Sequence, residues 1–264
     1  MNRTLTLAFT LFSTFGIGMS YGQSIVVPVY TYSAAHFADG QGFTSDIILT
    51  NLDSGPHCFS VRFVGNSGYY VAVPLVDYGA VTAARVCLAG LGSQTLKTTG
   101  GSSPVLEGWV WLGCDVSVAS CTNTGTGAAV TGSVVFRWSR PGLPDFEAAV
   151  PFDATASSHL AVPYDNTNGY FSGMAITNPF AGAYTTVTLI FHAENGATIF
   201  TATLNMAPAQ HMSFVLPSAF PQLAGTRGVM EAVSSSGTEI GLVALRFTPA
   251  GPFTTLFPVT STSW

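Results

Sequence analysis

Four aromatic residues are the best candidates for a ligand-binding surface. Trp109 and Trp111 lie two positions apart in a predicted strand, so their side chains project from one face. Tyr69 and Tyr70 lie in a nearby predicted strand. Flat aromatic rings on a sheet stack on sugar rings, so one hypothesis is carbohydrate binding through these residues. Burial of both tryptophans in a core is the alternative.

Acidic residues offer a second chemistry, hydrolysis of a glycosidic bond. That reaction needs two carboxyl groups facing each other across a cleft, about 5–10 Å apart. The candidates are Glu107, Asp115, Asp145 and Glu147, and their spacing singles out no pair. A hydrolase without a recognisable motif therefore stays an alternative, and the chain is expected not to be an enzyme.

Other polar patterns are better explained as turns or solvated residues. Asp53-Ser54-Gly55 occurs once, so it lacks the second carboxylate of an aspartic-protease dyad, and a type I turn accounts for it. Oxygen-rich loops beginning at Asp39 and Asp165 lack the calcium-binding pattern, and turns are favoured there. We expect no catalytic, cofactor or metal site.

The histidines are scattered. They are His36, His57, His159, His192 and His211, and none has the spacing of a metal-binding motif. His192 and His211 could approach each other across the second half of the chain, but isolated strand histidines are usually exposed or hydrogen-bonded.

Four cysteines, Cys58, Cys87, Cys114 and Cys121, lie in the first half of the chain. An even number behind a secretory segment predicts two disulfides in an oxidising compartment. The short loop between Cys114 and Cys121 favours that pair, which leaves Cys58–Cys87 to join two strands. A zinc site is the rival interpretation, but it lacks C-x-x-C spacing.

The N-terminus predicts export. Arg3 precedes the apolar stretch 4–19, and the small residues Ser20 and Gly22 place a cut before Gln23, so residues 1–22 are expected to be a cleaved signal peptide. A retained N-terminal anchor is the alternative. No later apolar run is long enough for a transmembrane helix. Only 8% of residues are charged and the formal net charge is −5, which argues against nucleic-acid binding.

Short strands must position these residues, and they occur twice. Residues 42–51, GFTSDIILTN, return at 169–178 as GYFSGMAITN, and 134–138, VVFRW, return at 243–247 as VALRF. The second match places Arg137 and Arg246 at equivalent positions. Their expected partners are Glu107 in the first copy and Glu231 or Glu239 in the second.

Runs of β-branched and aromatic residues separated by Gly, Asn and Pro turns predict antiparallel strands that match in order between the copies. The first copy has 25–30, 45–50, 58–64, 69–75, 81–88, 107–112, 133–138 and 146–152. The second has 160–164, 173–177, 185–191, 198–204, 211–216, 228–233, 240–247 and 253–259. The disulfide Cys58–Cys87 is expected to be specific to the first copy, with Thr185 and Leu216 at the corresponding positions.

The repeated strands resemble tandem immunoglobulin-like sandwiches of secreted bacterial surface proteins. The resemblance rests on the "ILTN" and "AITN" strands, the V-x-hydrophobic-x-F strand and the closing hairpin with its Arg-aromatic, Gly, Phe and Pro residues. It implies an all-β fold of two immunoglobulin-like antiparallel sandwiches, 23–153 and 158–264, after the signal peptide. The first carries a disulfide-bearing insertion near 113–131.

These patterns together predict a secreted, non-catalytic module for surface, adhesion or assembly roles. It would act outside the cell or at its surface, or in the periplasm. A glycan or another surface protein is the expected partner, and no nucleic acid or cofactor is expected. Carbohydrate binding, hydrolysis and an outer-membrane β-barrel are the alternatives, and the oligomeric state stays open.

Overall fold

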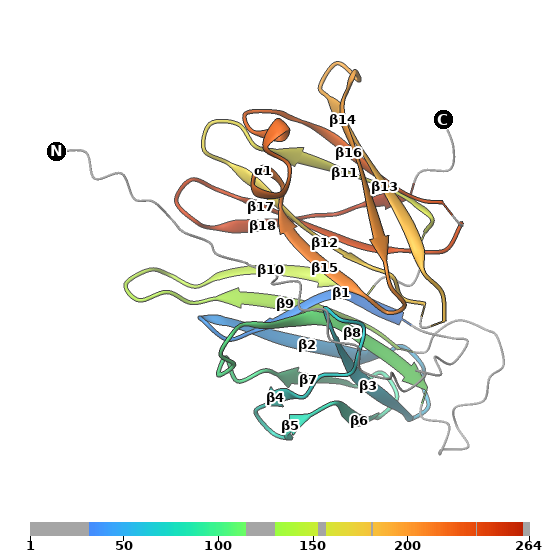
Figure 1. Ribbon diagram of the computed structural model, residues 1–264. Helices are drawn as coiled ribbons and strands as arrows, with labels where there is room; N and C mark the ends of the chain where they lie inside the picture. The colour runs from blue at the N-terminus through green and yellow to red at the C-terminus, as the bar shows by residue number, and fades with distance from the viewer. Residues whose placement is uncertain (1–31, 115–129, 153–156, 181, 236, 261–264) are drawn as a thin grey trace.

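The computed structural model describes residues 32–114, 130–152, 157–180, 182–235 and 237–260, and these are almost entirely antiparallel strands. Figure 1 shows two stacked halves, the first coloured blue to green and the second yellow to red. No helix in these ranges is long and apolar enough to cross a membrane. The all-β prediction is confirmed.

The first half contains two four-stranded sheets and one hairpin. Its strands are β1 Tyr32–Asp39, β2 Phe43–Asn51, β3 His57–Gly65, β4 Val73–Leu75, β5 Gly79–Val81, β6 Ala83–Leu88, β7 Ser93–Lys97, β8 Leu106–Cys114, β9 Val130–Trp138 and β10 Phe146–Pro151. One sheet has the order β1-β8-β3-β6 and the other β10-β9-β2-β7, while β4 pairs with β5.

The second half repeats this plan with one added strand. Its elements are β11 His159–Asp165, β12 Phe171–Thr177, β13 Thr185–Ala193, β14 Thr198–Met206, β15 His211–Val215, α1 Leu216–Ala219, a 3-10 turn Pro221–Leu223, β16 Arg227–Ser234, β17 Gly241–Phe247, β18 Phe253–Leu256 and β19 Val259–Thr260. Its sheets have the orders β14-β13-β16-β11-β19 and β15-β12-β17-β18. The strand orders show that β11, β13, β14 and β16 correspond to β1, β3, β6 and β8 of the first half.

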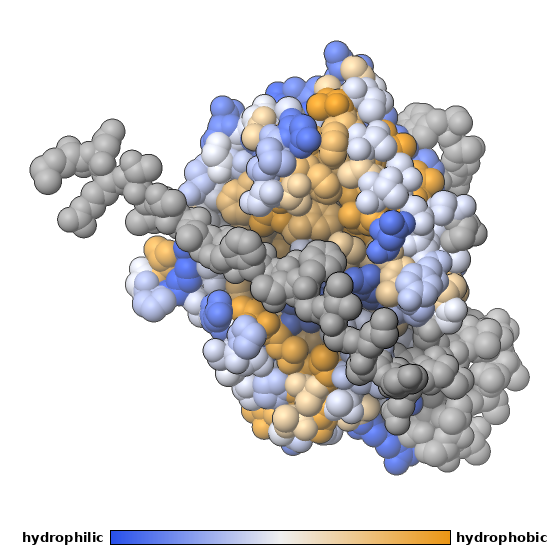
Figure 2. Space-filling view, viewed as in Figure 1, coloured by the Kyte–Doolittle hydropathy of each residue, from blue (hydrophilic) through white to orange (hydrophobic). Residues whose placement is uncertain are grey.

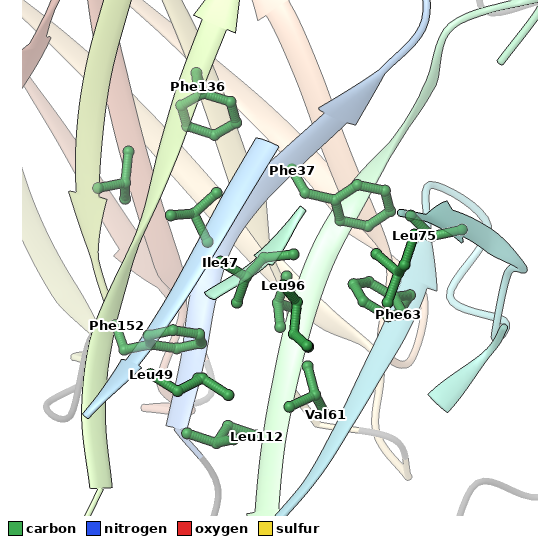
Figure 3. Packing of buried hydrophobic residues seen from close by; sticks show 14 of the residues in the cluster. Phe37, Ile47, Leu49, Val61, Phe63, Leu75, Leu96, Leu112, Phe136 and Phe152 are labelled. Carbon is green, nitrogen blue, oxygen red and sulfur yellow. The ribbon is translucent and has the colours of Figure 1, made fainter. Parts of the chain in front are cut away.

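Alternation along the strands builds the core of the first half. In β2 the buried residues Ile47 and Leu49 alternate with half-buried neighbours, as expected for a strand that faces a core on one side. Figure 3 shows them packed with Phe63 and Leu112 of the opposite sheet. Phe37 meets Phe63 edge to face, with ring centroids 5.6 Å apart.

The same edge-to-face pair recurs in the second half. Tyr164 and Phe191 lie with ring centroids 5.7 Å apart, at the positions that correspond to Phe37 and Phe63. The copies therefore share packing geometry as well as strand order.

The sheet β15-β12-β17-β18 is buried on both faces. Met174 and Leu242 point into the core of the second half, whereas their neighbours Ala175 and Val243 belong to the core of the first half. Strand β1 contacts β12 and β17, and β10 contacts β18. The two halves are therefore joined through a continuous apolar core.

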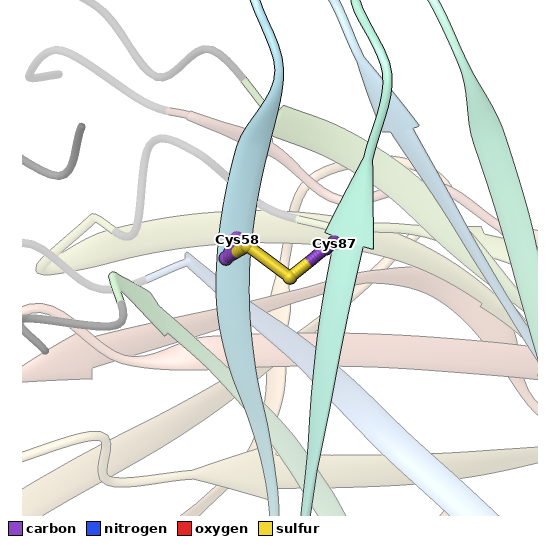
Figure 4. Close-up of a disulfide and its surroundings, with 2 residues drawn as sticks. All are labelled: Cys58 and Cys87. Atoms are coloured by element: carbon purple, nitrogen blue, oxygen red, sulfur yellow. A yellow bond between two sulfur atoms is a disulfide. The ribbon is translucent and has the colours of Figure 1, made fainter. Parts of the chain in front are cut away.

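The disulfide between Cys58 and Cys87 is confirmed, and it joins directly opposed residues of β3 and β6 (Figure 4). The predicted pair Cys114–Cys121 lies outside the described side chains. In the second half, Thr186 of β13 faces Asn205 of β14 at the corresponding pair, and their side chains are 3.0 Å apart. The expected counterpart Leu216 is wrong because β14, not β15, corresponds to β6, and Thr185 is one residue away from Thr186, the true counterpart of Cys58.

Several strand predictions need correction. The predicted strand 25–30 lies outside the described residues, and β1 begins at Tyr32. Of the run 69–75, only Val73–Leu75 is a strand, and it pairs with β5 in a hairpin that has no counterpart among the described residues of the second half. The polar strand β7 was not predicted because its letters, SQTLK, hold a single aliphatic residue, Leu96.

The two arginines of the VVFRW and VALRF match are not equivalent. Ser45 lies opposite Phe136, but its counterpart Ser172 lies opposite Arg246. The match is thus offset by one residue from the true register, and such an offset turns side chains to the opposite face of a sheet. Arg137 consequently points away from the core.

The predicted partners of these arginines are also wrong. Arg137 pairs with Glu147 across β9 and β10 at 2.6 Å. Arg246 reaches Asp165 of the opposite sheet at 2.7 Å and lies over the ring of Tyr170.

Candidate functional site

The two predicted tryptophans share one face of a strand, as expected, but other residues bury them. Trp109 and Trp111 do project from one face of β8, on the outer side of their sheet, and Val229 and Glu231 occupy the matching positions in the second half. They are only 1% and 3% exposed. A sugar ring therefore has no open indole face to stack on.

Neighbouring groups account for this burial. Nε1 of Trp109 donates a hydrogen bond to the carbonyl oxygen of Ala209, from the second half, at 2.9 Å. The guanidinium of Arg62 lies 4.9 Å from the centre of the Trp111 ring and also binds the hydroxyl of Tyr70. Tyr69 is exposed and lies outside the buried cluster that Trp109 and Trp111 form with Val64 and Ala209.

The predicted carboxylates lie in different surroundings. Asp145 and Glu147 are half-exposed beside Arg137. Glu107 accepts hydrogen bonds from residues at the junction between the halves, and Asp115 lies outside the described residues. The described members of the set thus include no pair held together for glycoside hydrolysis.

The loop aspartates already receive donors from the protein. Asp39 is buried and accepts bonds from the backbone of Gly100 and Ser102. Asp165 accepts bonds from Thr167 and Arg246. Asp53 receives the backbone N–H of the following residue and faces His57 at 2.9 Å, as the turn interpretation expects.

The histidines separate into three groups, and His192 does not approach His211. His159 and His192 each place Nε2 2.8 Å from the carboxylate of Glu231. His57 pairs with Asp53, and His36 joins His211. No cluster of three or more possible metal ligands occurs within the described ranges.

A polar chain crosses the junction between the halves. Nδ1 of His36 on β1 lies 3.0 Å from Nε2 of His211 on β15, and Nδ1 of His211 lies 2.7 Å from Oδ1 of Asn66. Asn66 and Ser213 both donate to Oε1 of Glu107, at 2.9 Å. The chain thus links three strands and a turn drawn from both halves.

Hydrogen-bond direction constrains the protonation of the two histidine rings in this chain. Because a carboxylate only accepts, the amide nitrogen of Asn66 faces Glu107 and its oxygen faces His211. Nδ1 of His211 must then carry a proton. When the His211 ring is neutral, its Nε2 accepts from Nδ1–H of His36, and Nε2 of His36 is then unprotonated.

Burial favours the neutral form of His36. It lowers the pKa of His36 below the ordinary histidine value, and the nearby charge of Glu107 only partly offsets this effect. The His36 ring also stacks on His211, with ring centroids 5.0 Å apart.

An apolar pocket of about 300 Å³ adjoins this chain at the junction. Figure 2 shows apolar side chains gathered on both halves, above and below the junction. The first half contributes His36, Ala38, Gln41, Phe43, Val105, Glu107 and Trp138 to the pocket wall. The second contributes Phe171, Gly173, Met174, Ala175, Ser213, Phe214, Val215, Val243, Leu245 and Phe247.

Two stacked aromatic pairs, one from each half, contribute to this wall. Phe43 stacks on Trp138 with ring centroids 5.3 Å apart, and Phe171 stacks on Phe247 at 4.7 Å. Gly173 also lines the pocket. A side chain at this position would be crowded, because its Cβ would lie 3.1 Å from the ring of Phe247.

No protein-family model matches the chain, and no curated protein matches it with significance. The site therefore has to be interpreted from its own chemistry.

Sequence reasoning did not assemble this site because its parts are far apart in the chain and come from both halves. A usable clue was present in the differences between the copies. By strand register, His36 stands where the second half has Pro163, and Glu107 stands where it has Arg227. Positions at which a duplicated strand departs from its copy are candidates for a local role.

Proposed function

We propose that the protein is a secreted, non-catalytic module of two immunoglobulin-like sandwiches that serves in surface adhesion or assembly. The disulfide between Cys58 and Cys87 supports an oxidising location. The apolar core at the junction supports a role in which the two halves act as one rigid unit, because separating them would expose Val243 and Phe253 to water.

Strand pairing supports the immunoglobulin-like comparison in part. In that fold the second strand pairs with the fifth and the third with the sixth. When the β4–β5 hairpin is left out of the count, β7 and β8 are the fifth and sixth strands of the first half. The pairs β2–β7 and β3–β8 then agree with this rule, as do β12–β15 and β13–β16 in the second half. The first and seventh strands have exchanged sheets, since β1 pairs with β8 and β9 pairs with β2.

The main support for an assembly role comes from the edge strand β14. It ends its sheet, and its sequence TIFTATLNM holds neither a charge nor a proline along nine residues. Natural edge strands usually carry such residues to prevent pairing with other chains. An uncharged terminal strand is therefore suited to contact with another protein strand.

The outer face of β14 and the adjoining end of β13 carry short, uncharged polar side chains. Thr188 lies opposite Thr203, and Thr186 lies opposite Asn205. Short hydroxyl and amide side chains can exchange hydrogen bonds with a protein surface and lose little conformational entropy when they are held in place.

The test places lysines on this edge. T201K/T203K should abolish self-association or attachment to the surface of the producing cells, because charged edge residues block strand pairing. T131K/S139K adds the same charge at exposed positions of the first half and is the matched control. Sedimentation velocity and a cell-binding assay with purified protein are the readouts. Equal behaviour of the two variants, or monomeric non-adherent wild-type protein, would refute the assembly role.

A further inference from the structure

The polar side chains that line the junction pocket include two with acceptor atoms, Glu107 and His36. Oε1 of Glu107 accepts from Asn66 and Ser213, and within the described ranges Glu107 forms no ion pair with a basic residue. A partly buried carboxylate is best stabilised by a positive charge nearby. The pocket therefore favours a cation over an anion.

His36 supplies the second acceptor. In the form with a neutral His211 ring, Nδ1–H of His36 donates to His211, and the unprotonated Nε2 of His36 has no hydrogen-bond partner among the residues that the structure describes. A ligand N–H can donate to this nitrogen. An ammonium group, which carries several N–H donors and a positive charge, would satisfy both Glu107 and His36.

The remaining wall suits an apolar body next to such a group. Aromatic side chains from both halves line it, among them Phe43, Phe171 and Phe214. Aromatic rings attract cations through the negative face of the ring and pack well against other rings. The volume of about 300 Å³ fits a small molecule but not a peptide chain.

Nearby basic residues do not occupy this position. Arg140 lies 4.2 Å from the ring centre of Trp138, one of the wall residues, but does not itself line the pocket. Arg62 is engaged by Tyr70 and Trp111.

We infer that the junction pocket binds a small organic ammonium ion with an aromatic or branched apolar body, held between Glu107 and His36. This assignment does not depend on the assembly role of β14. The site is formed by both halves, so its occupant would also strengthen their contact.

A matched ligand series tests the assignment on purified full-length protein by isothermal titration calorimetry. Phenethylammonium should bind at least about tenfold more tightly than neutral 2-phenylethanol, which is about 1.4 kcal/mol. The anion 3-phenylpropanoate should bind more weakly than either. Absence of phenethylammonium binding at millimolar concentration, or equal affinity for the cation and the alcohol, would overturn the proposal.

Two variants separate the charge from the cavity. E107Q keeps the size and an acceptor oxygen, and it should weaken phenethylammonium about tenfold while leaving 2-phenylethanol unchanged. G173V adds bulk to the pocket wall and should weaken both ligands. If E107Q binds the ammonium as tightly as wild type does, the assignment to Glu107 is wrong, whatever the outcome for G173V.

Discussion

At the residue scale, the two halves share the hydrogen bonds of a buried asparagine at the end of the second strand. The amide nitrogen of Asn51 donates to the carbonyl oxygens of Gly55 and Ala89, and its oxygen accepts the N–H of Asp53. Asn178 repeats this pattern with Ala183, Ala207 and Phe180. The Asn of ILTN and AITN therefore ties two loops to a strand end.

Removing this tie should cost much more than removing an exposed amide. N51A or N178A removes a buried amide that makes three hydrogen bonds and should lower the free energy of unfolding by about 2–3 kcal/mol. N51D should be at least as harmful, because a carboxylate cannot donate. Urea unfolding measures the effect, with the exposed turn residue Asn195 changed to Ala as the control. A cost of N51A no larger than that of N195A would contradict the assigned role.

Asp165 gives a pH-dependent test at the same scale. Burial alone raises its pKa, but hydrogen bonds from Thr167 and Arg246 outweigh that effect, so the pKa lies below the ordinary aspartate value. A pKa lowered by folding stabilises the protein above the unfolded-state pKa, near about 3.9. That stability is lost as pH falls through the lowered folded-state pKa.

The stability difference between wild type and D165N should therefore be largest near neutral pH and shrink as the solution becomes more acidic than about pH 4. Urea unfolding across this range, with the exposed Asp77 changed to Asn as the control, measures it. A D165N effect that is the same at neutral and acidic pH would show that the Asp165 carboxylate charge does not stabilise the fold.

At the scale of elements, the sequence patterns predicted most strands and one disulfide correctly. Alternation revealed strands such as β2 and β13 because each buries one face. It failed for β7, whose side chains are mostly polar, and for the VVFRW and VALRF match, where similar letters sit one register position apart. Letter similarity does not report hydrogen-bond register, since register depends on the partner strand.

The disulfide position allows a test of the strand correspondence. C58A/C87A should lower the free energy of unfolding by about 3–4 kcal/mol, since the bridge closes a loop with a sequence separation of 29. If Thr186 and Asn205 truly correspond to the cysteines, T186C/N205C should form a new bridge in the second half. A free-thiol assay measures this. T188C/N205C, a diagonal pair, should stay reduced. Oxidation of both pairs alike would argue against the correspondence.

At the scale of the whole molecule, the sheet β15-β12-β17-β18 makes the two halves interdependent. Its residues Ala175, Val243 and Phe253 complete the core of the first half, while Met174 and Ile176 serve the second. A strand that is buried on both faces has a continuous apolar sequence, as in AIT of β12 and LVAL of β17. Such a sequence does not indicate which face packs on the first half and which on the second. The pocket and the His36–His211 contact were unpredictable for the same reason: they exist only where the halves meet.

Differential scanning calorimetry of the purified chain tests this shared core most directly. One core across the junction predicts a single unfolding transition, with the calorimetric enthalpy equal to the van't Hoff enthalpy. Two separable transitions, one for each half, would contradict it.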